Sequence, residues 1–103
     1  MITLAIEHDI TDYAVWKQAF DRFASARHSA GVRAHRIRRP IGVADHVHVE
    51  LDFDTAEQAQ GFLDFLTTAI WSTPANAPAL RGAPQTRLLD VMEQSAVTDA
   101  ALA

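Results

Sequence analysis

Residues 46–53 read HVHVELDF, and their polar and apolar side chains alternate strictly along the chain. This period of two is typical of a strand that buries one face and leaves the other in polar surroundings. Residues 32–39, VRAHRIRR, form a second extended segment, and only the six residues PIGVAD separate the two. A connection this short joins neighbouring antiparallel strands, so the two segments predict a β-hairpin.

The chain upstream of this hairpin predicts a strand followed by a helix. Residues 2–8 alternate in the manner of a half-buried strand. Residues 13–30 carry apolar side chains at steps of three and four, and Thr11 or Asp12 can cap the start of this helix. Gly31 follows at the position where a glycine commonly ends a helix.

The downstream chain repeats this order. Thr55 and Gln58 form a capping-box signature, and a helical stripe continues from them as far as Ile70. Residues 72–84 contain three prolines and a glycine, which predicts an irregular excursion with at most a short helical turn. Residues 85–93 then read as a fourth strand.

The resulting order, β-α-β-β-α-β, predicts an α+β ferredoxin-like domain: a four-stranded antiparallel sheet with both helices on one face. A hairpin register that places Arg33 opposite Asp52 and His35 opposite Glu50 pairs opposite charges and brings apolar residues together. The other face of the sheet is then uncovered. Its expected residues are Thr3, Ala5, Glu7, Arg33, His35, Ile37, Arg39, His46, His48, Glu50 and Asp52.

Length and composition restrict the class of protein. The 103 residues predict a single domain over 1–94 and a disordered tail over 95–103. A net charge of −4 argues against nucleic-acid binding, and no apolar run is long enough to cross a membrane. With no cysteine and no secretory signal pattern, we expect a cytoplasmic protein, and the uncovered sheet face predicts a homodimer.

The candidate catalytic residues are expected on the uncovered face of the sheet. His35 and Glu50 are expected to be cross-strand neighbours, and a carboxylate beside an imidazole raises its pKa into a range useful for proton transfer. His48 shares this face, so His35, Glu50 and His48 are the candidate catalytic residues. The alternative is that His35 and Glu50 form a purely structural pair.

A candidate substrate pocket adds three residues. Glu7 and Arg33 belong to the same expected face, and Trp71 either closes the core or lines the mouth of a pocket. Trp16, in the middle of the first helical stripe, is expected in the core.

Metal binding is a weaker interpretation of the same strand. His46, His48 and Glu50 project from one face at steps of two, and with His35 they offer ligands suited to zinc, iron or copper. A solvated strand has the same pattern. We therefore expect no metal and no cofactor, and the spacing of the histidines does not select haem either.

Four stretches together resemble the antibiotic-biosynthesis-monooxygenase-like proteins of the dimeric α/β-barrel superfamily: DYAVWKQAFD, GVRAHRIRR, HVELDFDTAEQAQGFL and LLDVME. The resemblance spans residues 2–93 and implies that two sheets pack face to face in a homodimer. Cofactor-independent monooxygenases, polyketide cyclases and haem-degrading enzymes belong to this superfamily. Two functions follow as expectations: a cofactor-independent enzyme of monooxygenase or cyclase type, or a non-catalytic dimer that binds a small ligand or only associates.

Overall fold

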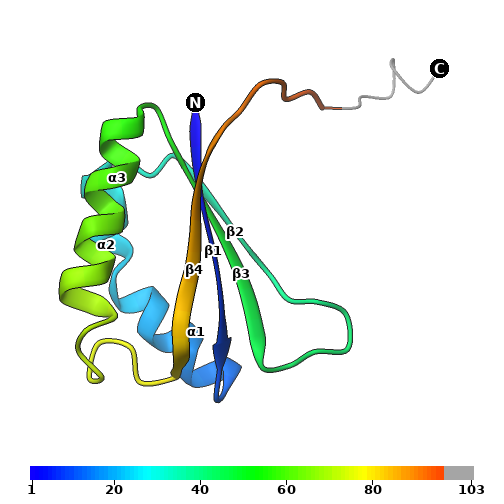
Figure 1. Ribbon diagram of the computed structural model, residues 1–103, viewed down its shortest axis with the longest axis vertical. Coiled ribbons are helices and arrows are strands. Elements are labelled where there is room, and N and C mark those ends of the chain that lie inside the picture. Colours follow the sequence, from blue (N-terminus) through cyan, green and yellow to red (C-terminus); the bar gives the residue numbers. More distant parts are fainter. Residues whose placement is uncertain (97–103) are drawn as a thin grey trace.

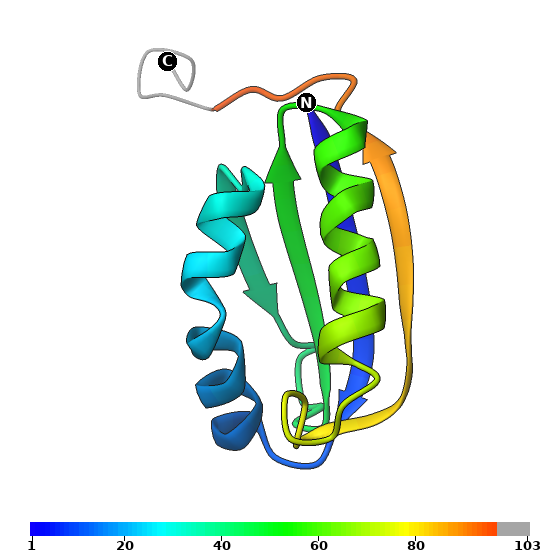
Figure 2. The ribbon, with the colours of Figure 1, turned by 90° about the vertical axis from the view of Figure 1, so that its left-hand side faces the viewer.

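The computed structural model describes residues 1–96 and confirms the expected α+β architecture. An antiparallel sheet of four strands, in the order β2-β3-β1-β4, is covered by helices on one face only (Figures 1 and 2). The expected tail, residues 95–103, falls for the most part outside the described residues. The elements are β1 (Ile2–Ile10), α1 (Tyr13–Arg22), α2 (Ala24–Ala30), β2 (Ala34–Arg38), β3 (His46–Phe53), α3 (Ala56–Phe65), the π-helical turn η1 (Leu66–Ile70) and β4 (Leu80–Asp90).

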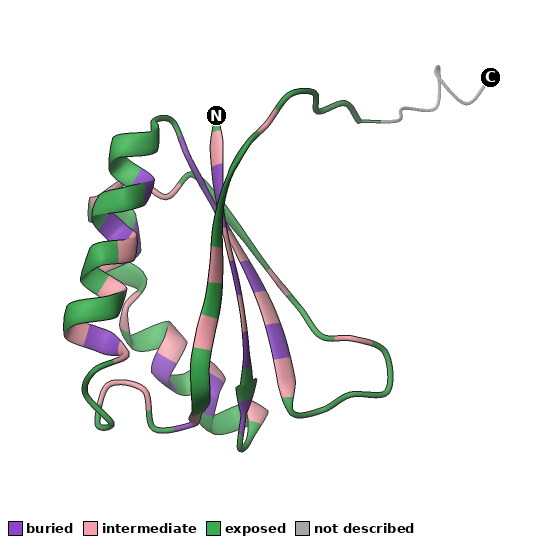
Figure 3. Ribbon diagram, in the orientation of Figure 1, coloured by how far each residue is buried: buried purple, intermediate pink, exposed green. Residues whose placement is uncertain are grey.

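Alternation along β1 and β3 places the core as the sequence predicts. The buried apolar side chains of both strands face the helices, and buried residues alternate with less buried ones along much of each strand (Figure 3). Thr3 and Asp52 lie on the other face but are buried too, and the hydroxyl of Thr3 donates to the carboxylate of Asp52 at 2.7 Å. None of the helices in the described part of the chain is long and apolar enough to cross a membrane. The buried core comprises Leu4, Ile6, Ile10, Val47, Val49, Leu51 and Phe53 from the sheet and Trp16, Ala19, Ala59, Phe62, Ile70 and Ala79 from the covering layer.

The first helix is interrupted, although the sequence predicts one continuous helix. Asp12 caps α1 by accepting a hydrogen bond from the backbone of Val15, but Phe23 leaves the helical conformation at φ −101° and ψ 18°. The buried Arg27 donates to the carbonyl of Phe20 at 2.6 Å, which satisfies an acceptor exposed at the interruption. The chain then continues as α2, which ends as predicted at Gly31 in the left-handed conformation.

The predicted register of the hairpin is wrong by one residue. Ala34 lies opposite Asp52, and Arg36, not His35, lies opposite Glu50. The backbone N–H of Arg33 also donates to the carbonyl of Asp52, at 2.8 Å, so two residues oppose one in the pattern of a β-bulge.

Because side chains alternate along a strand, a shift of one residue places every side chain of β2 on the opposite face of the sheet from the one predicted. His35 turns toward the helices, where its ring lies 5.4 Å from that of Phe20. Ile37 likewise packs against the core instead of lying on the open face. Arg36 and Arg38 lie on the open face of the sheet, where His35 and Ile37 were expected.

The fourth strand begins earlier than the sequence predicts, at Leu80 instead of residue 85. Its pairing with β1 shifts between Glu7 and Asp9, so the extra residues of β4 bulge out of the ladder. Gly82, at φ 76°, and Pro84 lie in this bulge. A proline is tolerated there because it withholds no ladder hydrogen bond. Gly82 and Pro84 therefore mark an irregular part of a strand, whereas the sequence predicted a loop at these residues.

Candidate functional site

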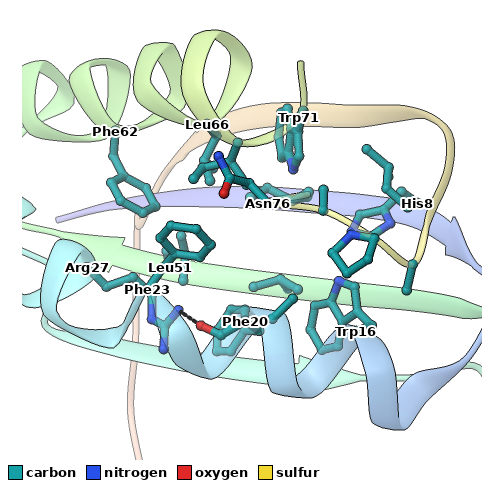
Figure 4. A pocket seen from close by; sticks show the side chains of 18 residues that line it. His8, Trp16, Phe20, Phe23, Arg27, Leu51, Phe62, Leu66, Trp71 and Asn76 are labelled. Carbon is teal, nitrogen blue, oxygen red and sulfur yellow. Dashed lines mark hydrogen bonds between the residues drawn. The ribbon is translucent and has the colours of Figure 1, made fainter. Parts of the chain in front are cut away.

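A cavity lies between the helices and the covered face of the sheet (Figure 4). Its volume is about 80 Å³, and its walls are largely apolar and aromatic. β1 and β3 form the floor, α1, α2 and α3 form the sides, and the segment after η1 closes one end. Its lining includes His8, Trp16, Phe20, Arg27, Trp71 and Asn76.

His8 is the basic side chain at one end of this cavity. It is 6% exposed, and its Nδ1 lies 3.1 Å from the backbone carbonyl of Asp9. A carbonyl can only accept, so Nδ1 carries the proton and Nε2 keeps its lone pair. Nε2 has no hydrogen-bond partner among the described residues. Burial lowers the pKa of His8, mainly because the charged imidazolium loses its hydration, so the side chain is a neutral base at pH 7.

Aromatic rings form the walls next to His8. The ring of Trp16 stacks on Phe20 at 5.2 Å between centroids and lies 6.1 Å from the ring of His8. Trp71 faces them across the cavity (Figure 4). The cavity is therefore lined by both tryptophans of the chain. Trp71 thus lines the cavity and also packs against the hydrophobic core.

Arg27 lies at the opposite end of the cavity from His8 (Figure 4). It is only 7% exposed, and its guanidinium lies 3.7 Å from the centroid of the Phe20 ring. Its hydrogen bond goes to a backbone carbonyl, and no carboxylate among the described residues forms an ion pair with it. A buried cation without a counter-ion favours a ligand that carries negative charge.

Asn76 contributes a further polar group to the cavity. Its side-chain N–H donates to the carbonyl of Ala69 at 2.8 Å, which orients the amide. The side-chain oxygen has no hydrogen-bond partner among the described residues and remains available to a donor on a ligand.

The candidate catalytic residues of the sequence analysis do not come together. Glu50 lies on the open face, where Arg36 and Arg38 bind its carboxylate at 3.0 and 2.7 Å. His48 shares this face, but His35 faces the helices, so the expected pair of His35 and Glu50 is wrong. The pKa of His35 is lowered, by burial and then by nearby cations, whereas the expected pair would raise it.

The expected substrate-pocket residues are also distributed over three places. Trp71 lines the inner cavity, and Glu7 lies on the open face. Arg33 lies at the start of the β-bulge and forms an exposed ion pair with Asp54 at 2.7 Å. The open face does hold a shallow polar depression of about 290 Å³, which Glu7, His48 and Glu50 help to line.

The sequence analysis missed His8 and Arg27, although both follow the patterns that it used. His8 continues the series Leu4, Ile6 at steps of two, which assigns it to the covered face. Arg27 lies seven residues after Phe20 on the apolar stripe of the first helical segment. A polar residue at a position that the period assigns to the core is a candidate site residue.

Solved structures show the same fold. A proposed antibiotic biosynthesis monooxygenase from Bordetella bronchiseptica superposes on 89% of this chain and 97% of its own, with TM-score 0.70 and 13% identity. A dimeric ferredoxin-like protein from an uncultured marine organism matches over 93% and 99%, with TM-score 0.68 and 11% identity. SnoaB, a cofactor-independent oxygenase from Streptomyces nogalater, matches over 90% and 94%, with TM-score 0.65 and 15% identity.

At these identities the likeness defines the fold. The chain has the ferredoxin-like fold of the antibiotic biosynthesis monooxygenase-like proteins. No protein-family model matches the sequence, and a search of curated proteins finds no significant match.

Proposed function

We propose that the protein is a cofactor-independent oxygenase that acts on a hydroxylated aromatic or polyketide-like substrate in the inner cavity. The observation that carries the proposal is a buried, neutral histidine whose free Nε2 borders an aromatic-lined cavity. SnoaB, which has this fold, is described as a cofactor-independent oxygenase, and this supports the reaction class.

The chemistry follows from the positions of the two basic side chains. His8 takes a proton from a phenol or enol, and the resulting anion is electron-rich enough to reduce dioxygen directly. One oxygen atom enters the substrate as a carbonyl in place of two hydrogens, and the other leaves as water. Arg27, at the far end, holds a negatively charged or strongly polar group of the substrate. The apolar walls exclude water from the anion.

The size of the cavity limits which molecules can bind in it without a change in its walls. A volume of about 80 Å³ is roughly half that of an apolar cavity of about 150 Å³ that admits benzene. An aromatic substrate therefore needs part of the wall to move. Trp71 and residues 76–79 line one side of the cavity, and the segment 71–79 belongs to no helix or strand, so this segment is the part of the wall that we expect to move.

Ligand binding in the cavity should quench tryptophan fluorescence, because the only two tryptophans of the chain, Trp16 and Trp71, both line it. We expect hydroxylated polycyclic aromatics to cause saturable quenching. The single-tryptophan variants Trp16→Phe and Trp71→Phe should both still show saturable quenching, since the remaining indole of each variant borders the same cavity. Quenching no stronger than that of free N-acetyltryptophanamide would contradict a ligand site at this place.

We further propose a homodimer in which the open faces of two sheets pack together. The helices leave this face uncovered (Figure 1), and a matching structure is described as dimeric. It carries charges of both signs and the partly exposed Leu89, which suits a polar interface with some apolar area. Light scattering at micromolar concentration should give about twice 11.3 kDa. A mass of one chain that persists at high concentration would contradict the dimer.

A further inference from the structure

Three potential metal ligands meet on the open face of the sheet, near the end that carries the hairpin loop. Glu7 on β1 lies directly opposite His48 on β3, and Asp9 lies directly opposite His46. One donor atom from each of Glu7, His46 and His48 lies within 4.8 Å of the other two. We propose that these three residues form a binding site for a divalent transition metal, with zinc the best fit.

The distances between the donor atoms match those around a small tetrahedral ion. Oε2 of Glu7 lies 3.4 Å from Nε2 of His46 and 3.2 Å from Nδ1 of His48. Zinc binds nitrogen and oxygen at about 2.0–2.1 Å, so tetrahedral ligand atoms lie about 3.3–3.4 Å apart. An ion can therefore be bound with little movement of Glu7, and only the two imidazoles need to close toward each other.

The donor set favours the same class of metal. Two imidazoles and a carboxylate suit zinc or iron(II), whereas magnesium and calcium prefer oxygen ligands alone. Three protein ligands also leave one position of a tetrahedral ion for water or for a ligand. In the single chain all three side chains are partly exposed, so none of them is buried in the chain's own core.

Asp9 supplies the outer support that such sites use. Nδ1 of His46 donates to the carboxylate of Asp9 at 2.7 Å, which orients the ring so that Nε2 points toward Oε2 of Glu7, 3.4 Å away, where the metal would bind. A carboxylate behind a metal-binding histidine orients the ring and increases its basicity. Asp9 is therefore a positioning residue, not a ligand.

The site is separate from the proposed oxygenase cavity. The side chains of His8 and of the three ligands project from opposite faces of the sheet. Loss of one function therefore leaves the other testable, because a variant of the metal site does not touch the cavity.

Zinc titration of the chelator-treated full chain tests the inference. Calorimetry should show one zinc ion per chain, and cobalt(II) should give the absorption of a tetrahedral complex. His46→Ala should abolish this binding, whereas His28→Ala, which removes an exposed histidine from α2, should not change it. Each variant is first checked for a native circular-dichroism spectrum and thermal midpoint.

A second pair of variants tests the role of Asp9. Asp9→Asn should weaken zinc binding about 10- to 100-fold by removing the carboxylate behind His46. Asp45→Asn changes a nearby carboxylate that pairs with Arg81 instead, and it should leave the affinity unchanged. The inference is overturned if the folded wild-type chain binds no zinc at micromolar concentrations, or if His46→Ala binds zinc as tightly as the wild type. Equal affinities of Asp9→Asn and Asp45→Asn would overturn the positioning role.

Discussion

His8→Gln is expected to lower the turnover of the oxygenase reaction about 10²- to 10⁴-fold, the usual contribution of a positioned general base. Glutamine is close to histidine in size and keeps a polar group in the cavity, but it cannot accept a proton at neutral pH. The measurement is the initial rate of oxygen uptake at saturating substrate, after circular dichroism has shown that the variant is folded. His28→Gln is the matched control, because His28 is exposed on α2 and away from the cavity lining.

The pH profile of the same reaction identifies the base. A base works only when it is unprotonated, and burial lowers the pKa of His8 below 6.5. The rate should therefore fall to half its maximum only at a pH below 6.5, the pH at which an ordinary histidine is half protonated. In His8→Gln the residual rate should no longer show this fall at low pH. A wild-type profile that falls to half at or above pH 6.5, or a variant that retains the fall, would show that another group is the base.

Trp16→Ala is expected to lower the free energy of unfolding by about 3–5 kcal/mol, a large fraction of the stability of a domain this small. Trp16 is 8% exposed and packs between the rings of Tyr13, at 5.7 Å, and Phe20, at 5.2 Å. Alanine removes both ring contacts and enlarges the cavity that the indole borders.

The adjacent residue provides the control. Val15 lies on the same helix but is 42% exposed, so Val15→Ala should change the free energy of unfolding by no more than about 0.5 kcal/mol. Urea denaturation followed by circular dichroism measures both variants. Similar losses in the two variants would mean that α1 does not pack on the sheet through Trp16.

The fold was predictable because its decisive signals are local. The alternation in β1 and β3, the caps at Asp12 and Thr55 and the glycine at residue 31 each specify an element without reference to the rest of the chain. Once the order of elements is known, few arrangements bury one face of the sheet and both helical stripes. The covered and open faces of β1 and β3 followed directly from this pattern.

The expected pair of His35 and Glu50 was wrong because it depended on one residue of register. The segment VRAHRIRR holds four arginines, which can remain solvated on either face, so its pattern does not decide between two registers that differ by one residue. Charge pairing favoured the register in which His35 faces Glu50. The structure has the other register, in which Ala34 lies opposite Asp52 and the N–H of Arg33 donates to the carbonyl of the same Asp52, and nothing in this sequence marks that arrangement.

The cavity itself was not predictable from periodicity. Trp71 and Asn76 reach it from the irregular segment after η1, where neither a helical nor a strand period assigns a direction to a side chain. The interruption of the first helix at Phe23 also brings Arg27 to the cavity wall, and neither glycine nor proline marks this break. These features arise from packing between elements, so they appear only when the elements are assembled.

Oxygen uptake by the wild-type protein, without flavin and with a chelator present, tests the central claim most directly. With a hydroxylated polycyclic aromatic that quenches Trp16 and Trp71, we predict the uptake of one dioxygen per substrate and a product that contains one oxygen atom from ¹⁸O₂. The chelator removes any contribution from a metal on the open face. A substrate that saturates the cavity but consumes oxygen no faster than in the absence of protein would contradict the claim and leave a protein that binds without catalysis.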